Sequence, residues 1–85
     1  MLYLISYDLR PAATNDDFYR IDAAIKDLGG HKILVSQWAA RSDLTSADLR
    51  DYLQQFMSGS DRLLLTEITA TNWASYNTMF NLNAV

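Results

Sequence analysis

Apolar and polar positions along this chain follow two periods, one typical of strands and one typical of helices. Residues 2–9 (LYLISYDL) form an unbroken strand-like run, whose even-numbered and odd-numbered residues would lie on opposite faces of a sheet. Residues 32–41 and 62–70 predict two more strands. The stretch 32–44 fits either one long strand or a hairpin, in which a short extra strand would lie around residues 38–41.

Residues 14–30 have the helical period. Their apolar residues recur as one stripe, which consists of Phe18, Ile21, Ile25 and Leu28. Thr14 or Asn15 can cap the start of this helix. Gly29 and Gly30 provide a left-handed stop at its end.

Residues 43–57 predict a second helix. Thr45 is the expected cap, and Asp48, three residues later, is the expected acidic partner of a capping box. The buried stripe of this helix consists of Leu49, Tyr52, Leu53 and Phe56. Residues 58–61 (SGSD) predict a turn before the last strand.

The alternation of strands and helices predicts an α+β fold. The compact solution is the ferredoxin-like (βαββαβ) sandwich, an antiparallel sheet with two helices on one face. The first strand carries large apolar groups on both faces, such as Leu2 and Leu4 against Tyr3 and Ile5, so both faces are expected to be buried. A second subunit is the economical cover for the face without helices, which predicts a sheet-to-sheet homodimer.

The chain divides into two parts by its character. Residues 1–72 are expected to form the ferredoxin-like domain. Residues 73–85 form a C-terminal aromatic tail, which has no charged residue but carries Trp73, Tyr76 and Phe80. The spacing of these three residues fits a helical stripe, and a short extra strand is the alternative. We expect this tail to pack on its own sheet or, in the favoured interpretation, on the dimer partner, because a disordered tail rarely carries so many large apolar groups.

Composition narrows the functional classes. A chain of 85 residues suits one small domain, whose core alone would be marginal. The absence of cysteine excludes disulfides, and a single histidine makes a zinc site unfavourable. The net charge of −3 argues against a general electrostatic grip on nucleic acid or anionic lipid. No apolar run approaches the roughly 20 residues of a membrane span, and no basic leader is visible, so we expect a cytoplasmic protein without a membrane partner.

Three segments in this order resemble a known family. LISYDLR opens the chain, VSQWAA is followed by LTSADLRDYL, and DRLLLTEIT comes last. Over roughly residues 1 to 70 they resemble the small ferredoxin-fold CRISPR-associated protein that partners the integrase in spacer acquisition, and most closely its SinR-like branch. The resemblance implies a homodimer with facing sheets, often closed by an exchanged C-terminal strand. It also implies a nuclease dependent on Mg²⁺ or Mn²⁺, or a non-catalytic scaffold for DNA.

Asp8 is the candidate catalytic and metal-binding residue. It matches the aspartate that ends the first strand in this family, close to the two-fold axis. Magnesium is held by one or two carboxylates with waters and phosphate, so two copies of Asp8 could hold one ion that bridges phosphate oxygens and activates water. In the alternative interpretation Asp8 only ends the strand, accepting hydrogen bonds from nearby backbone N–H groups ahead of Pro11.

Weaker candidates lie close to the strand ends. Ser6 and Ser36 could ligate an ion or phosphate, although small residues at a crowded interface are the commoner case. Arg10 and Arg41 could meet phosphate, but we expect them to be solvated. His31 is expected to be a surface residue.

Two tryptophans and one acid complete the candidates. Trp38 and Trp73 could stack on bases, but core and dimer anchors are the favoured roles. Glu67 would lie either on a solvated stretch of the open face or, in the favoured interpretation, in a structural ion pair with Arg62 or Arg41 across an interface.

Two functional hypotheses follow from the sequence. The first is nucleic-acid binding or a divalent-metal-dependent endonuclease or endoribonuclease, with Asp8 paired across the dimer and RNA, DNA or a larger protein as partner. The alternative is a non-catalytic dimerisation or interaction module of the antiviral defence or toxin–antitoxin type. The acidic balance favours the second hypothesis.

Overall fold

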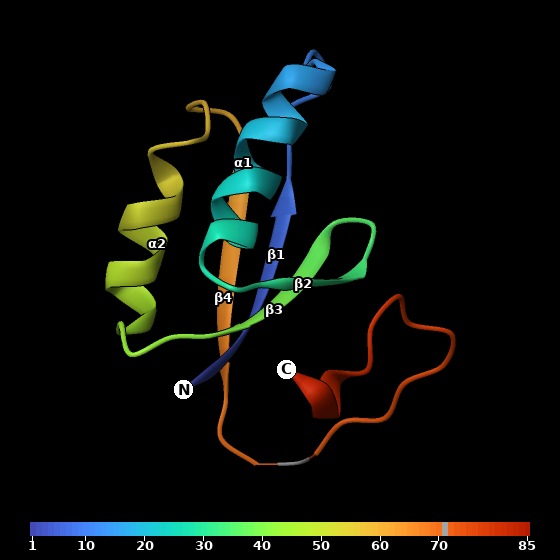
Figure 1. The fold of residues 1–85 in the computed structure, drawn as a ribbon. Coiled ribbons are helices and arrows are strands. Elements are labelled where there is room, and N and C mark those ends of the chain that lie inside the picture. The colour runs from blue at the N-terminus through green and yellow to red at the C-terminus, as the bar shows by residue number, and fades with distance from the viewer. Residues whose placement is uncertain (71) are drawn as a thin grey trace.

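The computed structural model describes residues 1–70 and 72–85. Thr71, which falls within the predicted domain 1–72, lies outside the described residues. Two helices and four strands alternate along the chain, followed by a short 3-10 helix η1 (Figure 1). The elements are β1 (Leu2–Asp8), α1 (Asn15–Asp27), β2 (His31–Leu34), β3 (Gln37–Arg41), α2 (Ser46–Gln54), β4 (Arg62–Ile68) and η1 (Leu82–Ala84).

The strands form one antiparallel sheet in the order β2-β3-β1-β4. The first strand is therefore central, between β3 and β4. In register, Leu2 lies opposite Arg41 of β3 and Ile68 of β4, and Asp8 lies opposite Arg62 of β4. The predicted α+β class, with a four-stranded antiparallel sheet and two helices, is confirmed.

The stretch 32–44 forms a hairpin and not one long strand. Val35 and Ser36 connect β2 to β3, and the register shifts between Lys32 and Leu34. The predicted short strand around residues 38–41 is β3, which begins one residue earlier. A Val-Ser connection carries none of the glycine or asparagine signals of tight hairpin turns, so the sequence alone did not decide between a hairpin and one long strand.

The helix ends follow from specific hydrogen bonds. Thr14 caps α1 in a complete capping box with Asp17, whose carboxylate accepts from the Thr14 backbone N–H at 2.8 Å. Gly29, at φ +81°, provides the left-handed stop. Thr45 caps α2 and accepts from the Asp48 backbone N–H, but the return bond expected from the Asp48 side chain is not formed among the described residues.

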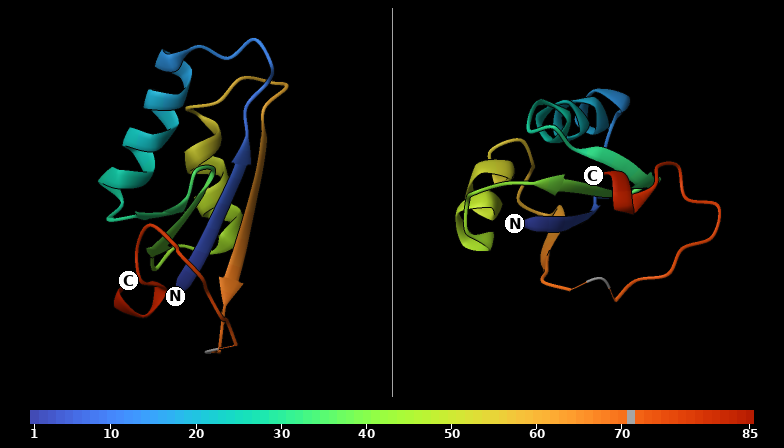
Figure 2. Two further views of the ribbon diagram at one scale, coloured as in Figure 1. Left: turned by 90° about the vertical axis from the view of Figure 1, so that its right-hand side faces the viewer. Right: turned by 60° about the horizontal axis from the view of Figure 1, so that its bottom comes forward.

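The main core lies between the helices and one face of the sheet. The odd-numbered residues of β1 are buried against both helices, which lie together on one side of the sheet (Figure 2). This core is built on Tyr3, Ile5, Tyr7, Ile21, Ile25, Trp38, Leu49 and Leu53. Phe18 departs from its predicted stripe, because it lies in the first turn of α1 and is 42% exposed.

Neither helix of the described chain is long and apolar enough to cross a bilayer.

A second, smaller core lies on the opposite face of the sheet, where the C-terminal tail returns to its own chain (Figures 1 and 2). The Met79 backbone N–H donates to the Ile33 carbonyl oxygen at 2.9 Å, and the Phe80 ring stacks on His31 at 4.0 Å. Leu82 is buried here. Its neighbours in this core are Leu2, Leu4, Ile33, Ala39, Ile68, Trp73, Phe80 and Val85. In this structure the tail therefore packs on its own sheet, which was the less favoured of the two expectations.

Candidate functional site

The tail covers only part of the face without helices. The remaining part, which we call the open strip, consists of Ser6, Asp8, Gln37, Arg62 and Leu64. All five residues point to the same face, since they are register partners at alternate positions of three neighbouring strands. The strip combines a carboxylate, a guanidinium and a leucine that is 63% exposed. It is thus a polar surface with one exposed apolar group, which lies on the edge strand β4.

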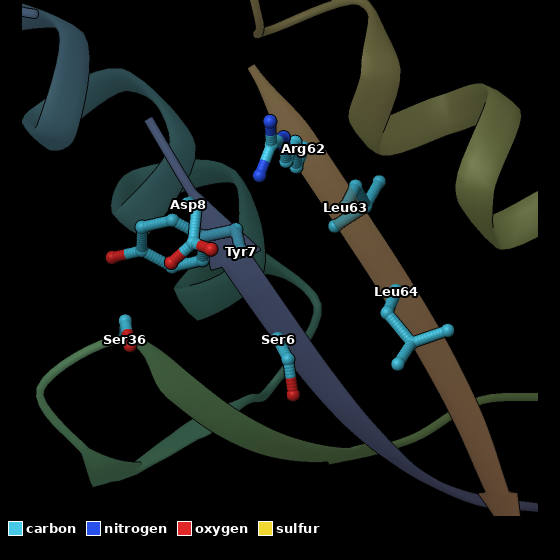
Figure 3. Close-up of a pocket in the computed structure, with 7 residues that line it drawn as sticks. All are labelled: Ser6, Tyr7, Asp8, Ser36, Arg62, Leu63 and Leu64. Carbon is cyan, nitrogen blue, oxygen red and sulfur yellow. The ribbon is translucent and has the colours of Figure 1, made fainter. Parts of the chain in front are cut away.

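A shallow hollow of about 250 Å³ lies along the open strip (Figure 3). Its lining includes the side chains of Ser6, Asp8, Arg62 and Leu64, as well as Ser36 at the hairpin connection. Ser36 is held here because its carbonyl oxygen accepts from the Tyr7 backbone N–H at 3.2 Å. The structure thus brings together three of the sequence candidates, Asp8, Ser6 and Ser36.

Asp8 is exposed at the end of β1, as predicted. Its carboxylate forms no hydrogen bond and no ion pair with any of the described residues. The expectation that it accepts from backbone N–H groups ahead of Pro11 is therefore wrong for this structure. The Arg10 backbone N–H in that segment donates instead to Asp61, at 2.7 Å.

The hollow offers a modest set of ligands for a divalent cation. One chain supplies the Asp8 carboxylate and two serine hydroxyls, of which Ser6 already accepts from Gln37 Nε2 at 3.0 Å. Mg²⁺ keeps several waters and is commonly bound through one or two carboxylates and substrate phosphates, so these residues fit a weak site. A second Asp8 from another copy would complete it. Within the described residues, no group of three or more His, Asp or Glu side chains is arranged as a metal site.

Arg10 is engaged inside the molecule and is not a free phosphate ligand. Its guanidinium lies 2.7 Å from Asp17 and 3.3 Å from Asp61. The Asp61 side chain is 2% exposed and also accepts from the Ser58 backbone N–H at 2.8 Å. The hydrogen bond from the Arg10 backbone, together with Ser58 and the guanidinium, holds the pKa of Asp61 below its usual range. The cluster ties the start of α1 to the end of β1 and the start of β4.

The remaining charged candidates also have structural positions. Arg41 donates from Nε to the Val85 carbonyl oxygen at 2.7 Å, and so helps to hold the tail. Glu67 is exposed and lies on the opposite face of β4 from Arg62, because the two are an odd number of residues apart. Among the described residues Glu67 forms no ion pair. The expected ion pair with Arg62 or Arg41 is therefore not made within one chain.

A second polar cluster lies on the helix side of the sheet. The Tyr7 hydroxyl donates to Asp22 of α1 at 2.5 Å, and Lys32 approaches the same carboxylate at 3.5 Å. Burial and the hydrogen bond to Asp22 raise the pKa of Tyr7. Lys32 also lies over the Trp38 ring, 5.5 Å from its centroid. This cluster connects α1 to the sheet and is separated from the open strip by β1 itself.

The aromatic candidates are parts of the two cores. Trp38 is buried in the main core, which confirms its predicted core role. Trp73 packs against the second core on its own sheet. His31 is exposed, as predicted, and stacks on Phe80.

The sequence did not predict the roles of two site residues, Asp61 and Arg62. The signal for Asp61 was its place at the end of the SGSD turn, where an aspartate commonly accepts hydrogen bonds from nearby backbone N–H groups. The signal for Arg62 was its place at the start of β4, which antiparallel pairing sets against the end of β1.

No family model matches the chain.

Proposed function

We propose that this chain is a ferredoxin-like module that forms a face-to-face homodimer and serves as a non-catalytic interaction module, akin to the small CRISPR-associated proteins that it resembles. The strand order β2-β3-β1-β4, with both helices on one face, supports the ferredoxin-like plan. The observation that carries the dimer is the open strip, a partly apolar sheet surface that neither the helices nor the tail covers. Its charges also support the module over a phosphate-binding role, since the strip carries one acid and one base.

The oligomeric state tests this proposal directly. Sedimentation velocity over a range of micromolar concentrations should show a dimer. Leu64→Glu should shift the protein to monomer, because it places a charge within the proposed contact surface. Tyr19→Glu is the matched control, since Tyr19 is 75% exposed on α1, on the far side of the sheet. A wild-type chain that stays monomeric up to hundreds of micromolar would contradict the proposal.

A second candidate function is a metal-dependent phosphodiesterase. The observation that favours it is the Asp8 carboxylate, exposed in the hollow and engaged by no described residue. In this proposal Asp8 from both protomers holds Mg²⁺ or Mn²⁺, which would polarise a phosphate and activate water. A nuclease assay with either ion, on single-stranded and double-stranded RNA and DNA, tests it. Asp8→Ala should abolish cleavage, whereas Asp43→Ala, which removes an exposed acid from the loop before α2, should leave it intact. Cleavage that survives in Asp8→Ala would exclude this role.

A further inference from the structure

We propose that Asp8 and Arg62 form two reciprocal ion pairs across the dimer interface, each Asp8 binding the Arg62 of the second copy. This inference rests on the proposed face-to-face dimer and specifies its contacts. It starts from two neighbouring residues of opposite charge. Asp8 and Arg62 lie directly opposite each other in register, and both are exposed (Figure 3). Neither side chain forms an ion pair or hydrogen bond within the described part of the chain.

The oppositely charged residues closest in sequence to Asp8 and Arg62 already have partners. Asp61, the residue before Arg62, is bound by Arg10 and by the Ser58 backbone N–H. Arg10, two residues after Asp8, is bound by Asp61 and Asp17. The two nearest potential partners along the chain are therefore engaged. The unused pair points outward, on the face that the dimer would bury.

Two-fold symmetry explains why such a pair is self-complementary. In a face-to-face dimer the two-fold axis lies in the plane between the sheets. A residue on one side of the axis then faces a residue of the partner, namely the copy of the one that lies at the same distance on the other side of the axis. An axis that runs between β1 and β4 sets Asp8 against the partner copy's Arg62, and Arg62 against its Asp8. Both contacts are made at once, and both are attractive.

The same axis also places the apolar group of the strip. Ser6 and Leu64 are register partners on β1 and β4, so this axis sets each Leu64 against the Ser6 of the other copy. The hollow beside Ser6, about 250 Å³, is open space that a leucine side chain can enter. Leu64 is 63% exposed and would be buried there. Charge and shape therefore favour one position of the axis.

The metal-binding arrangement requires a different axis. To bring Asp8 onto the Asp8 of the second copy, the axis must pass over Asp8 itself, as it does when it runs along β1. Neighbouring strands are about 4.8 Å apart, so the two positions differ by about 2.4 Å. On β1 the axis brings two like charges together, which is unfavourable unless a cation lies between them. Between β1 and β4 no additional ion is needed.

A charge-exchange experiment tests the pairing. Asp8→Arg and Arg62→Asp should each weaken self-association at least tenfold, because each sets two like charges together twice in the dimer. An equimolar mixture of the two variants should form a heterodimer, since both of its contacts are again between opposite charges. The double variant Asp8→Arg/Arg62→Asp should recover self-association. Native mass spectrometry with one isotope-labelled chain identifies the heterodimer, and circular dichroism verifies that each variant is folded.

The controls separate failure of this inference from failure of the dimer. Arg20→Asp alters an arginine on α1 that is likewise exposed, and should leave self-association unchanged. A monomeric wild-type chain would overturn the dimer and this pairing together. A dimeric wild type whose charge variants neither weaken it nor form the heterodimer would overturn the pairing alone. So would a dimer that tightens only with Mg²⁺ or Mn²⁺ and loses this response in Asp8→Asn, which is the result expected for an axis along β1.

Discussion

Replacing Asp61 by asparagine should destabilise the fold far more than its place in a surface turn would indicate. One Asp61 oxygen accepts from the Arg10 backbone N–H at 2.7 Å, and the other accepts from the Ser58 backbone N–H at 2.8 Å. Asparagine keeps one acceptor and turns the other into a donor, which faces an N–H. A hydrogen bond to a charged group contributes about 1.5–3 kcal/mol, and the ion pair with Arg10 is weakened as well. We expect Asp61→Asn to lower the free energy of unfolding by about 2–3 kcal/mol at pH 7.

Urea denaturation monitored by circular dichroism measures this loss. Asp51→Asn is the matched control, because it also removes a carboxylate paired with an arginine, Arg50, but from a helix surface where the Asp51 side chain is 63% exposed. Its effect should stay within about 0.5 kcal/mol. Equal effects of the two substitutions would refute the reasoning from buried hydrogen bonds.

The effect of Asp61→Asn should also depend on pH. The folded pKa of Asp61 is lowered, first by the Arg10 backbone hydrogen bond, whereas the unfolded value is about 3.9. The carboxylate therefore stabilises the fold above about pH 4, and this contribution is lost as the pH falls through the folded pKa. The difference between wild type and Asp61→Asn should narrow over that acid range. A difference that stays constant down to pH 2 would contradict the assignment.

Three further predictions concern the cores and a helix end. Tyr7→Phe removes the hydrogen bond to Asp22 and should cost about 1–2 kcal/mol in urea denaturation. Burial raises the pKa of both Tyr3 and Tyr7, so absorbance titration of the wild type should show two late-ionising tyrosines and the variant one fewer, whereas an unchanged titration would contradict the assignment of Tyr7. Leu82→Ala should cost about 2–3 kcal/mol and speed hydrogen exchange at Met79, whose N–H bonds to Ile33, whereas an unaffected Met79 would mean that the tail is not held by Leu82. Gly29→Ala places a side chain at φ +81° and should cost about 1 kcal/mol in thermal unfolding, against a negligible change for Gly59→Ala, where the added carbon meets nothing within 4 Å and φ is not positive.

The regular elements were predictable because their patterns are local. The stripe of α1 and the alternation of β1 depend on spacing within one segment, and both are found in the structure. Phe18 was misplaced for a related reason. The stripe tells which side of a helix is apolar, but not how far the sheet beneath it extends.

The less predictable features depend on contacts between distant segments. The spacing of Trp73, Tyr76 and Phe80 predicted a helical stripe, but the only helix of the tail among the described residues is the short η1. The packing of the tail on His31 and Ile33 could not be read from this spacing. Asp8 was located correctly at the end of a strand. The expected backbone hydrogen bonds ahead of Pro11 are not made by Asp8, and one N–H of that segment, from Arg10, donates instead to Asp61, more than 50 residues away.

The strand order determines when each strand can pair while the chain is being synthesised. β1 is the first strand made and occupies the middle of the sheet, yet one of its two neighbours, β4, is the last strand made. Until β4 leaves the ribosome, the strand LYLISYD has an unpaired edge, and the apolar residues on its two faces lack much of their final cover. Such an edge can pair with other chains. Truncation before residue 62 should therefore give an aggregation-prone product, and full solubility should depend on completing the last strand.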